Sequence, residues 1–497
     1  MRAHGGLSRP ERAPAADRLQ LFTSHHVARW SAFVGLIVAA CLMPANADTY
    51  WHLRAGQDIA RSGQVSLVDR YSYTAAGQPW PDHEWLWQLL TYGVHHLGGM
   101  PLLTAMSAAM LFGAFALAES LAVGPWWVRL PLFILSVLLS GPLWAVRPAV
   151  LTLLALLAVT WLLSRDKDWL VPPIFLAWAN AHGAVVLGLV VVGAAFLTAA
   201  ARRERRRALR LGVVLAICGG LVLVTPLGWR LLSFIGESTE RSHLNGVTEW
   251  RSGLVPAPGS VAFWIVALAI SVSAARLWRK LPSFADQFLV ASALSFIPLG
   301  LQAVRNIGPF AILALPAASR LLAAANSTRV AALSEWLRRT FEGDTRASDD
   351  PIQEPLPSLR RNRRNLAAIT VGGALMVGWA WSRPYSGLNW TPVSPEAAAA
   401  IRGCPGQVFN EYNEGGYLIW FVPDRQVFID GRQDPYSLPF LKRAQALAHD
   451  ALVRAAVFRD YGIRCAALSP ESRLVAQLRA QGWRQTHRDE RWVVLAD

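Results

Sequence analysis

Acidic, imidazole and indole side chains gather between Asn46 and Trp87, directly after the first hydrophobic stretch. This segment opens on Asp48-Thr49-Tyr50-Trp51-His52 and closes on Trp80-Pro81-Asp82-His83-Glu84-Trp85. An ionisable side chain at a bilayer boundary costs free energy unless it has a partner or a task. Trp and Tyr suit the same depth, because their rings are apolar while their N–H and O–H groups stay hydrated. The clustering therefore predicts chemistry or ligand capture at a membrane surface.

The elements that must position these side chains are membrane spans. The chain is 53% hydrophobic, and its apolar residues recur in blocks of about 20, the length that crosses a ~30 Å hydrocarbon core. With the short, proline-broken stretch 169–181 included, the sequence predicts about 11 spans. The other blocks are 30–46, 101–123, 127–146, 149–163, 184–201, 208–227, 259–278, 283–301, 306–324 and 366–382. Glu84–Leu97 is apolar but short and ends at Gly98-Gly99, so we expect it to lie along the membrane surface.

Basic clusters beside the spans predict the orientation. The net charge of +15 is concentrated in 202–207, 279–280 and 360–364, which is the positive-inside pattern rather than a nucleic-acid surface, since no aromatic stacking platforms accompany it. From this orientation we predict, in chain order, a cytoplasmic tail (1–29), a transmembrane domain (30–325), a cytoplasmic basic linker (326–365) and a last span (366–382). The segment 46–87 then becomes the first external loop. The same orientation brings five further polar residues to the outer ends of spans: Arg147, His182, Arg230, Glu249 and Arg305.

Residues 383–497 change character and predict a small extracytoplasmic α/β domain with a mostly parallel sheet. Expected strands are 407–412, 425–430 and 465–468 with a hairpin-like pair at 483–487 and 491–495, and expected helices are 437–460 and 471–481. Asp430 and Arg432 follow a strand and either face a ligand crevice or form a turn that organises the strand end. Cys404 and Cys465 are a candidate disulfide in an oxidising compartment.

The loop and the span arrangement resemble the GT-C superfamily of membrane glycosyltransferases, with an architecture similar to protein O-mannosyltransferases. The motifs are also similar to those of bacterial polytopic membrane proteins of uncharacterised activity, and read here as Asp48–Gly56, His83–Leu86, Trp178–Gly183, Gly415–Leu418 and Phe428–Arg432. Asp48 is followed by Thr49, whereas protein O-mannosyltransferases share an adjacent Asp-Glu pair in this loop. The Trp-Trp-Asp signature of oligosaccharyltransferases is also missing, so the acceptor is not carried over.

The resemblance implies transfer of a hexosyl or pentosyl group from a polyprenyl-phosphate-linked donor to an acceptor at the outer face of the bacterial inner membrane. Asp48 is then the candidate base or acceptor-orienting residue, and Glu84 is the second acid. Arg147 and Arg305 suit the phosphate, because a guanidinium binds phosphate through charge-assisted pairs. The remaining candidate substrate-binding residues are Trp51, His52, His83, His182, Arg230 and Glu249.

The sequence leaves the cofactor open, and a divalent cation, Mg²⁺ or Mn²⁺, held by Asp48 and His52 is one candidate. No zincin, P-loop or Ser-centred motif occurs in the sequence. Two other functional classes stay open. A transporter or flippase for a lipid-linked substrate would place charges in broken helices, which Pro172-Pro173 and Asp286 allow. A non-catalytic scaffold or sensor would use the outer domain to bind a partner, and would need no acidic first loop.

Overall fold

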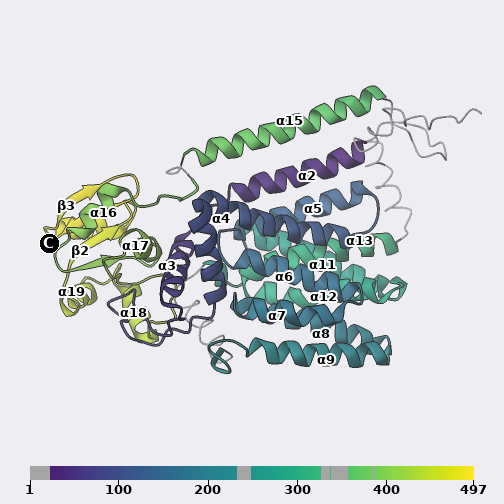
Figure 1. The fold of residues 1–497 in the computed structure, drawn as a ribbon, viewed down its shortest axis with the longest axis horizontal. Helices are drawn as coiled ribbons and strands as arrows, with labels where there is room; N and C mark the ends of the chain where they lie inside the picture. The colour runs from purple at the N-terminus through teal and green to yellow at the C-terminus, as the bar shows by residue number, and fades with distance from the viewer. Residues whose placement is uncertain (1–22, 232–247, 326–335, 337–355, 384–386) are drawn as a thin grey trace, which may run out of the picture.

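A computed structural model describes residues 23–231, 248–325, 336, 356–383 and 387–497. A helical bundle carries a small C-terminal domain at one end, with helix α3 lying between the two (Figure 1). We call this the domain end of the bundle and the opposite one the far end. The bundle helices are α2 (Ser24–Cys41), α4 (Trp85–Leu121), α5 (Trp126–Ser140), α6 (Ala149–Ser164), α7 (Val171–Ala179), α8 (Val186–Ala201), α9 (Arg205–Val222), α11 (Pro258–Leu277), α12 (Phe284–Gln302), α13 (Ile307–Ala325) and α15 (Leu356–Trp381).

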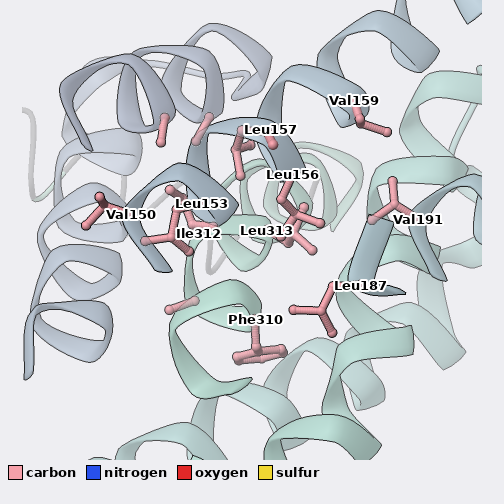
Figure 2. Packing of buried hydrophobic residues seen from close by; sticks show 14 of the residues in the cluster. Val150, Leu153, Leu156, Leu157, Val159, Leu187, Val191, Phe310, Ile312 and Leu313 are labelled. Atoms are coloured by element: carbon pink, nitrogen blue, oxygen red, sulfur yellow. The ribbon is translucent and has the colours of Figure 1, made fainter. Parts of the chain in front are cut away.

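Each predicted span coincides with one of these helices. In the described part of the chain, five segments are long and apolar enough to cross a membrane: Trp85–Leu121, Gly183–Ala201, Pro258–Lys280, Phe284–Gln302 and Val304–Ala325. Helices α5 and α6 are shorter but also apolar. Branched and aromatic side chains of α6, α8 and α13 fill the centre of the bundle, among them Leu156, Val191 and Phe310 (Figure 2). The chain is therefore a polytopic α-helical membrane protein.

Two helices begin earlier than the sequence suggested. Helix α15 starts at Leu356, so the arginines of 360–364 lie in its first turns rather than in a linker, and most of the predicted linker falls outside the described residues. Helix α2 starts at Ser24, within the predicted tail. Helices α2 and α15 run side by side (Figure 1), where the position of a Cβ on Gly373 lies 2.7 Å from Val38.

The first half of the predicted loop is a helix, α3 (Ala47–Ser62). Asn46 caps its N-terminus, since its side chain accepts a hydrogen bond from the Thr49 N–H at 3.2 Å, and Asp48 in the first turn faces the positive end of the helix dipole. A Cβ on Gly56 would lie 2.0 Å from the Gln88 carbonyl oxygen. Glycine at this position is thus what allows α3 to lie directly against α4.

Helix α4 is two helices joined at a kink. Gly98 and Gly99 leave helical geometry, and Gly99 has a φ of +63°, a conformation that favours glycine. Trp85–Leu97 is therefore a separate helical arm, as its length and glycine ending predicted, and the remainder of α4 descends into the bundle. The arm begins directly after Glu84 and carries that residue at the domain end.

The C-terminal domain holds helices α16 (Pro395–Arg402), α17 (Gly415–Phe421), α18 (Leu438–Ala446), α19 (Ala451–Asp460) and α20 (Arg473–Ala480). Its strands are β1 (Gln407–Asn410), β2 (Ile463–Leu468), β3 (Arg484–Arg488) and β4 (Val493–Ala496), in the order β1-β2-β4-β3. Only β1 and β2 pair in parallel, and the other two pairings are antiparallel. The expectation of a mostly parallel sheet was therefore wrong. A disulfide joins Cys404 to Cys465, as proposed from the sequence.

The predicted strand at 425–430 does not join this sheet. Val427 instead bridges Ser72 of the first loop, and the Val427 N–H donates to the Tyr71 carbonyl at 2.9 Å. The predicted helix at 437–460 is divided into α18 and α19, because Asp450 caps a new helix start. The first loop and the C-terminal domain are thus one packed unit above the bundle.

Candidate functional site

A cavity of about 840 Å³ lies at the domain end of the bundle. Its walls come from α3, the segments before α4, α6 and α8, the short helices Thr248–Trp250 and Val304–Asn306, and two loops of the C-terminal domain. The cavity collects most of the polar residues singled out from the sequence. Those among its lining residues are Asp48, Trp51, His52, His83, Glu84, Arg147, His182, Glu249 and Arg305.

Asp48 faces N–H donors. Its Oδ1 accepts from the Trp51 Nε1–H at 3.1 Å, its Oδ2 accepts from the Asn46 side-chain amide at 3.3 Å, and Arg147 lies 3.9 Å from Oδ2. Burial raises the pKa of Asp48, while Arg147 and the Trp51 hydrogen bond oppose that rise. A Cβ on Gly431 would lie 2.7 Å from Oδ1. The backbone of the C-terminal domain at Gly431 therefore lies close to the Asp48 carboxylate.

Glu84 lies among three imidazole rings. Its carboxylate oxygens are 3.5 Å from Nε2 of His52, 3.6 Å from Nε2 of His182 and 3.7 Å from Nε2 of His83. Burial raises the pKa of Glu84 well above its usual value; Asp82, Asp48 and Asp434 add to the rise, and Arg305 opposes it. The Glu84 carboxylate therefore holds a proton up to a higher pH than an ordinary surface carboxylate does.

The three histidines are held neutral by their burial. Burial lowers the pKa of His83 to about 4, and it lowers the pKa values of His52 and His182 well below the usual value. Nδ1 of His83 is 3.1 Å from the Pro81 carbonyl oxygen. Nδ1 of His182 is 2.6 Å from the Thr152 hydroxyl, which also accepts from the Trp178 indole N–H at 3.0 Å. These partners hold the rings of His83 and His182 so that Nε2 of each faces Glu84.

The two cavity arginines differ in how far their charge is neutralised. Arg147 pairs with Glu249 and approaches Asp48. Arg305 lies over the Trp250 ring, with its guanidinium carbon 4.6 Å from the ring centroid. Among the described residues, no carboxylate forms a salt bridge with Arg305. The cavity therefore contains a positive charge that is available to an anionic ligand.

Arg432 has a structural role that the sequence did not reveal. Its guanidinium is fully buried and binds Asp430 through two hydrogen bonds of 2.8 and 2.7 Å, and it reaches Asp69 of the first loop at 2.7 Å. It also lies over the rings of Tyr71 and Trp80, at 4.9 and 4.8 Å. The turn interpretation of Asp430 and Arg432 therefore holds. Arg432 also joins Asp69 of the first loop to Asp430 of the C-terminal domain, and we call these three residues the Arg432 clasp. Arg432 itself lines the cavity.

Arg230 is exposed and is not among the described residues that line the cavity. Its prediction as a site residue rested on its place at a span end, which does not determine the direction of its side chain. Asp82, Tyr412 and Asp434 line the cavity and were not predicted as site residues. Asp82 stands in the predicted Trp80–Trp85 string, and burial raises its pKa to about 7, so a fuller interpretation of that string would have included it. No pattern in the neighbouring sequence indicates Tyr412 or Asp434 as site residues, because they reach the cavity only through the packing of the C-terminal domain.

A metal held by Asp48 and His52 does not fit this arrangement. The oxygens of Asp48 already face an indole N–H, an amide N–H and a guanidinium, whereas Nε2 of His52 points to Glu84. Across the described ranges, no group of three His, Cys, Asp or Glu side chains has the geometry to hold a metal ion.

No protein-family model and no curated protein sequence matches the chain. Among solved structures, it is similar to the archaeal oligosaccharyltransferase AglB from Archaeoglobus fulgidus in complex with an inhibitory peptide and a dolichol-phosphate. The TM-score is 0.55, with 10% identity over 89% of this chain and 69% of that chain. The apo form of the Archaeoglobus fulgidus oligosaccharyltransferase gives a TM-score of 0.55 and 11% identity over 90% of this chain and 70% of that one.

The chain is also similar to ArnT from Cupriavidus metallidurans in the apo state, with a TM-score of 0.50 and 14% identity over 93% of this chain and 96% of that chain. AglB and ArnT are both membrane glycosyltransferases of the GT-C type. Their similarity extends over the bundle and the C-terminal domain together, at identities that establish the fold alone. The protein therefore has the GT-C fold of membrane glycosyltransferases.

Proposed function

We propose that the protein is a glycosyltransferase that moves a hexosyl or pentosyl group from a polyprenyl-phosphate-linked donor to an acceptor at the outer face of the cytoplasmic membrane. The observation that carries this proposal is the content of one cavity. Asp48 and Glu84 face the same space as Arg305, which forms no salt bridge with a carboxylate among the described residues. The AglB structure contains a dolichol-phosphate, which supports a polyprenyl phosphate as the ligand of that cation.

The proposed division of labour follows the charges. Arg305, with Arg147 beside it, holds the donor phosphate and stabilises the negative charge that grows as the sugar leaves. Asp48 takes or orients the acceptor hydroxyl, and Glu84 is the second acid. Trp51 offers an indole face and His52 and His182 offer ring nitrogens to a sugar, with Glu249 positioning Arg147. No step is assigned to a divalent cation, because the donor groups around Asp48 do not suit one.

The proposed location follows from which loops lie at the two ends. Arg207 bonds Asp166 at 2.5 Å and Arg202 reaches the Pro282 carbonyl at 3.5 Å, so the basic loops 164–168, 202–207 and 279–283 lie together at the far end. The cavity lies at the domain end. By the positive-inside rule, these loops support a far end in the cytoplasm and a C-terminal domain outside, and the disulfide supports the same orientation.

Transport of a lipid-linked substrate stays the alternative, but Asp286, one of the residues that allowed it, is paired with Arg320. The test is to incubate purified protein with a panel of radiolabelled polyprenyl-phosphate sugars and envelope acceptors. We expect the wild type to transfer label from at least one donor and Asp48→Asn to do so about 10²-fold more slowly or worse. Cys218→Ser, inside the bundle, is the control. Equal rates for wild type and Asp48→Asn would remove Asp48 from the chemistry, and an absence of turnover with every donor would favour transport.

A further inference from the structure

The two cavity acids face opposite kinds of partner. Three N–H-bearing groups surround the Asp48 carboxylate: the Trp51 indole, the Asn46 amide and the Arg147 guanidinium. Each of them stabilises the ionised form, and each would lose a favourable contact if Asp48 took up a proton. Among the described residues, the ion-pair partners of the Glu84 carboxylate are instead three imidazole Nε2 atoms, at 3.5 to 3.7 Å. A carboxylate among bases can share a proton with them.

The hydrogen bonds of two imidazoles show which ring presents a lone pair to Glu84 and which presents an N–H. The Pro81 carbonyl can only accept, so Nδ1 of His83 carries the ring proton and the neutral ring presents an Nε2 lone pair to Glu84. The Thr152 hydroxyl accepts from Trp178, which leaves its own proton free to bond Nδ1 of His182. His182 then presents an Nε2–H to the same carboxylate. Glu84 thus lies between a ring that donates and a ring that accepts.

We propose that Glu84 is the group that removes the acceptor's proton, while Asp48 stays ionised and orients the acceptor. This inference rests on the proposed function. A lone pair of the acceptor oxygen forms the bond to the anomeric carbon, and the bond from that carbon to the phosphate oxygen breaks with its electrons on the phosphate. The acceptor proton goes to an Oε atom of Glu84, where it faces the Nε2 lone pair of His83 before it leaves to solvent.

The charged groups around Glu84 set its pH dependence. Asp82, Asp48 and Asp434 contribute negative charge, Arg305 contributes positive charge, and His52, His83 and His182 surround the carboxylate itself. Burial and the three acids raise the pKa of Glu84. Glu84 must be ionised to accept a proton, so kcat should rise with pH through this elevated pKa, and that limb should vanish in Glu84→Gln.

The test compares two small nucleophiles with a polyprenyl-phosphate sugar as donor. Methanol must lose a proton to form a glycoside, whereas azide attacks as an anion and loses none. We expect Glu84→Gln to transfer to methanol about 10²- to 10⁴-fold more slowly than the wild type but to form glycosyl azide at a rate within a few-fold of it. Asp48→Asn, which loses the charge that orients the acceptor hydroxyl, should also be slow with methanol, but it should keep the pH limb because Glu84 is still present. His83→Gln should shift the pH limb rather than abolish turnover.

Each outcome decides the assignment. Glu84→Gln that is slow with azide as well would give Glu84 a structural or donor-binding role, and normal methanol transfer by this variant would exclude it as the proton acceptor. Glu84→Asp, with its charge kept, guards against misfolding and should retain the pH limb. A wild-type protein that uses no donor with either nucleophile would overturn the proposed function itself, and this assignment with it.

Discussion

At the scale of single residues, Arg305 most directly tests the binding of a phosphate. The guanidinium is held against Trp250 by a cation–π contact and faces the cavity. Replacing it by Gln removes a charge-assisted pair with the donor phosphate, so we expect Arg305→Gln to raise the KM for a polyprenyl-phosphate sugar by about tenfold or more. Arg230→Gln, which changes an exposed arginine outside the cavity lining, is the matched control. Both variants should be assayed for KM and kcat in the same detergent. An unchanged KM in Arg305→Gln would direct the search for the phosphate site elsewhere.

The cavity also shows what residue types and spacing can and cannot reveal. Asp48, Glu84, Arg147, His182 and Arg305 were recognisable because each is a charged or polar residue at the end of an apolar block, where an unpaired group is costly. Arg230 satisfied the same criterion but does not line the cavity, because a place at a span end does not determine where a side chain points. The reach of Arg432 to Asp69 across more than 300 residues of sequence has no local signal at all.

At the scale of elements, the Arg432 clasp joins the first loop to the C-terminal domain. Its three ionised groups are fully buried, and removing one member of such a set strands the other charges. We expect Arg432→Met to destabilise the domain-end unit by about 3–5 kcal/mol, seen as a clearly lower Tm for purified protein and as faster proteolysis of the C-terminal domain. The control is Arg402→Met, which breaks an ion pair whose side chains are 45% and 56% exposed. Such a surface pair contributes about 0–1 kcal/mol. If the two variants had equal Tm values, the clasp would not be an energetic link.

Element prediction succeeded where local pattern determines structure and failed where a distant partner does. Apolar blocks of membrane length became helices, and Gly98-Gly99 ended the Trp85–Leu97 arm as predicted. Residues 425–430 have a strand-like alternation, but their backbone pairs with the first loop rather than with β1. The choice between parallel and antiparallel pairing likewise depends on the whole chain path. The sheet was therefore wrongly predicted as mostly parallel, although its four strands lie where they were expected.

At the scale of the whole molecule, the two ends of the bundle differ in charge and in chemistry. The far end holds the basic loops, which form ion pairs among themselves. The domain end holds the cavity, the clasp and the Cys404–Cys465 disulfide. A lipid-linked donor is amphipathic, and its phosphate belongs at a bilayer boundary. A cavity at one end of the bundle that contains Arg305 therefore matches the place where such a phosphate would arrive.

This arrangement predicts which end faces which compartment. Ser62→Cys, at the exposed end of α3, and Leu452→Cys, on the surface of the C-terminal domain, should react with a membrane-impermeant maleimide in intact cells. Arg206→Cys, in the first turn of α9 at the far end, should react only after the membrane is permeabilised, because cationic segments are retained in the cytoplasm. The native Cys41 and Cys218 are buried and provide a low background. Labelling of Arg206→Cys in intact cells, with Ser62→Cys protected, would invert the topology. The cavity would then open to the cytoplasm, and a donor phosphate at the outer leaflet could not reach Arg305.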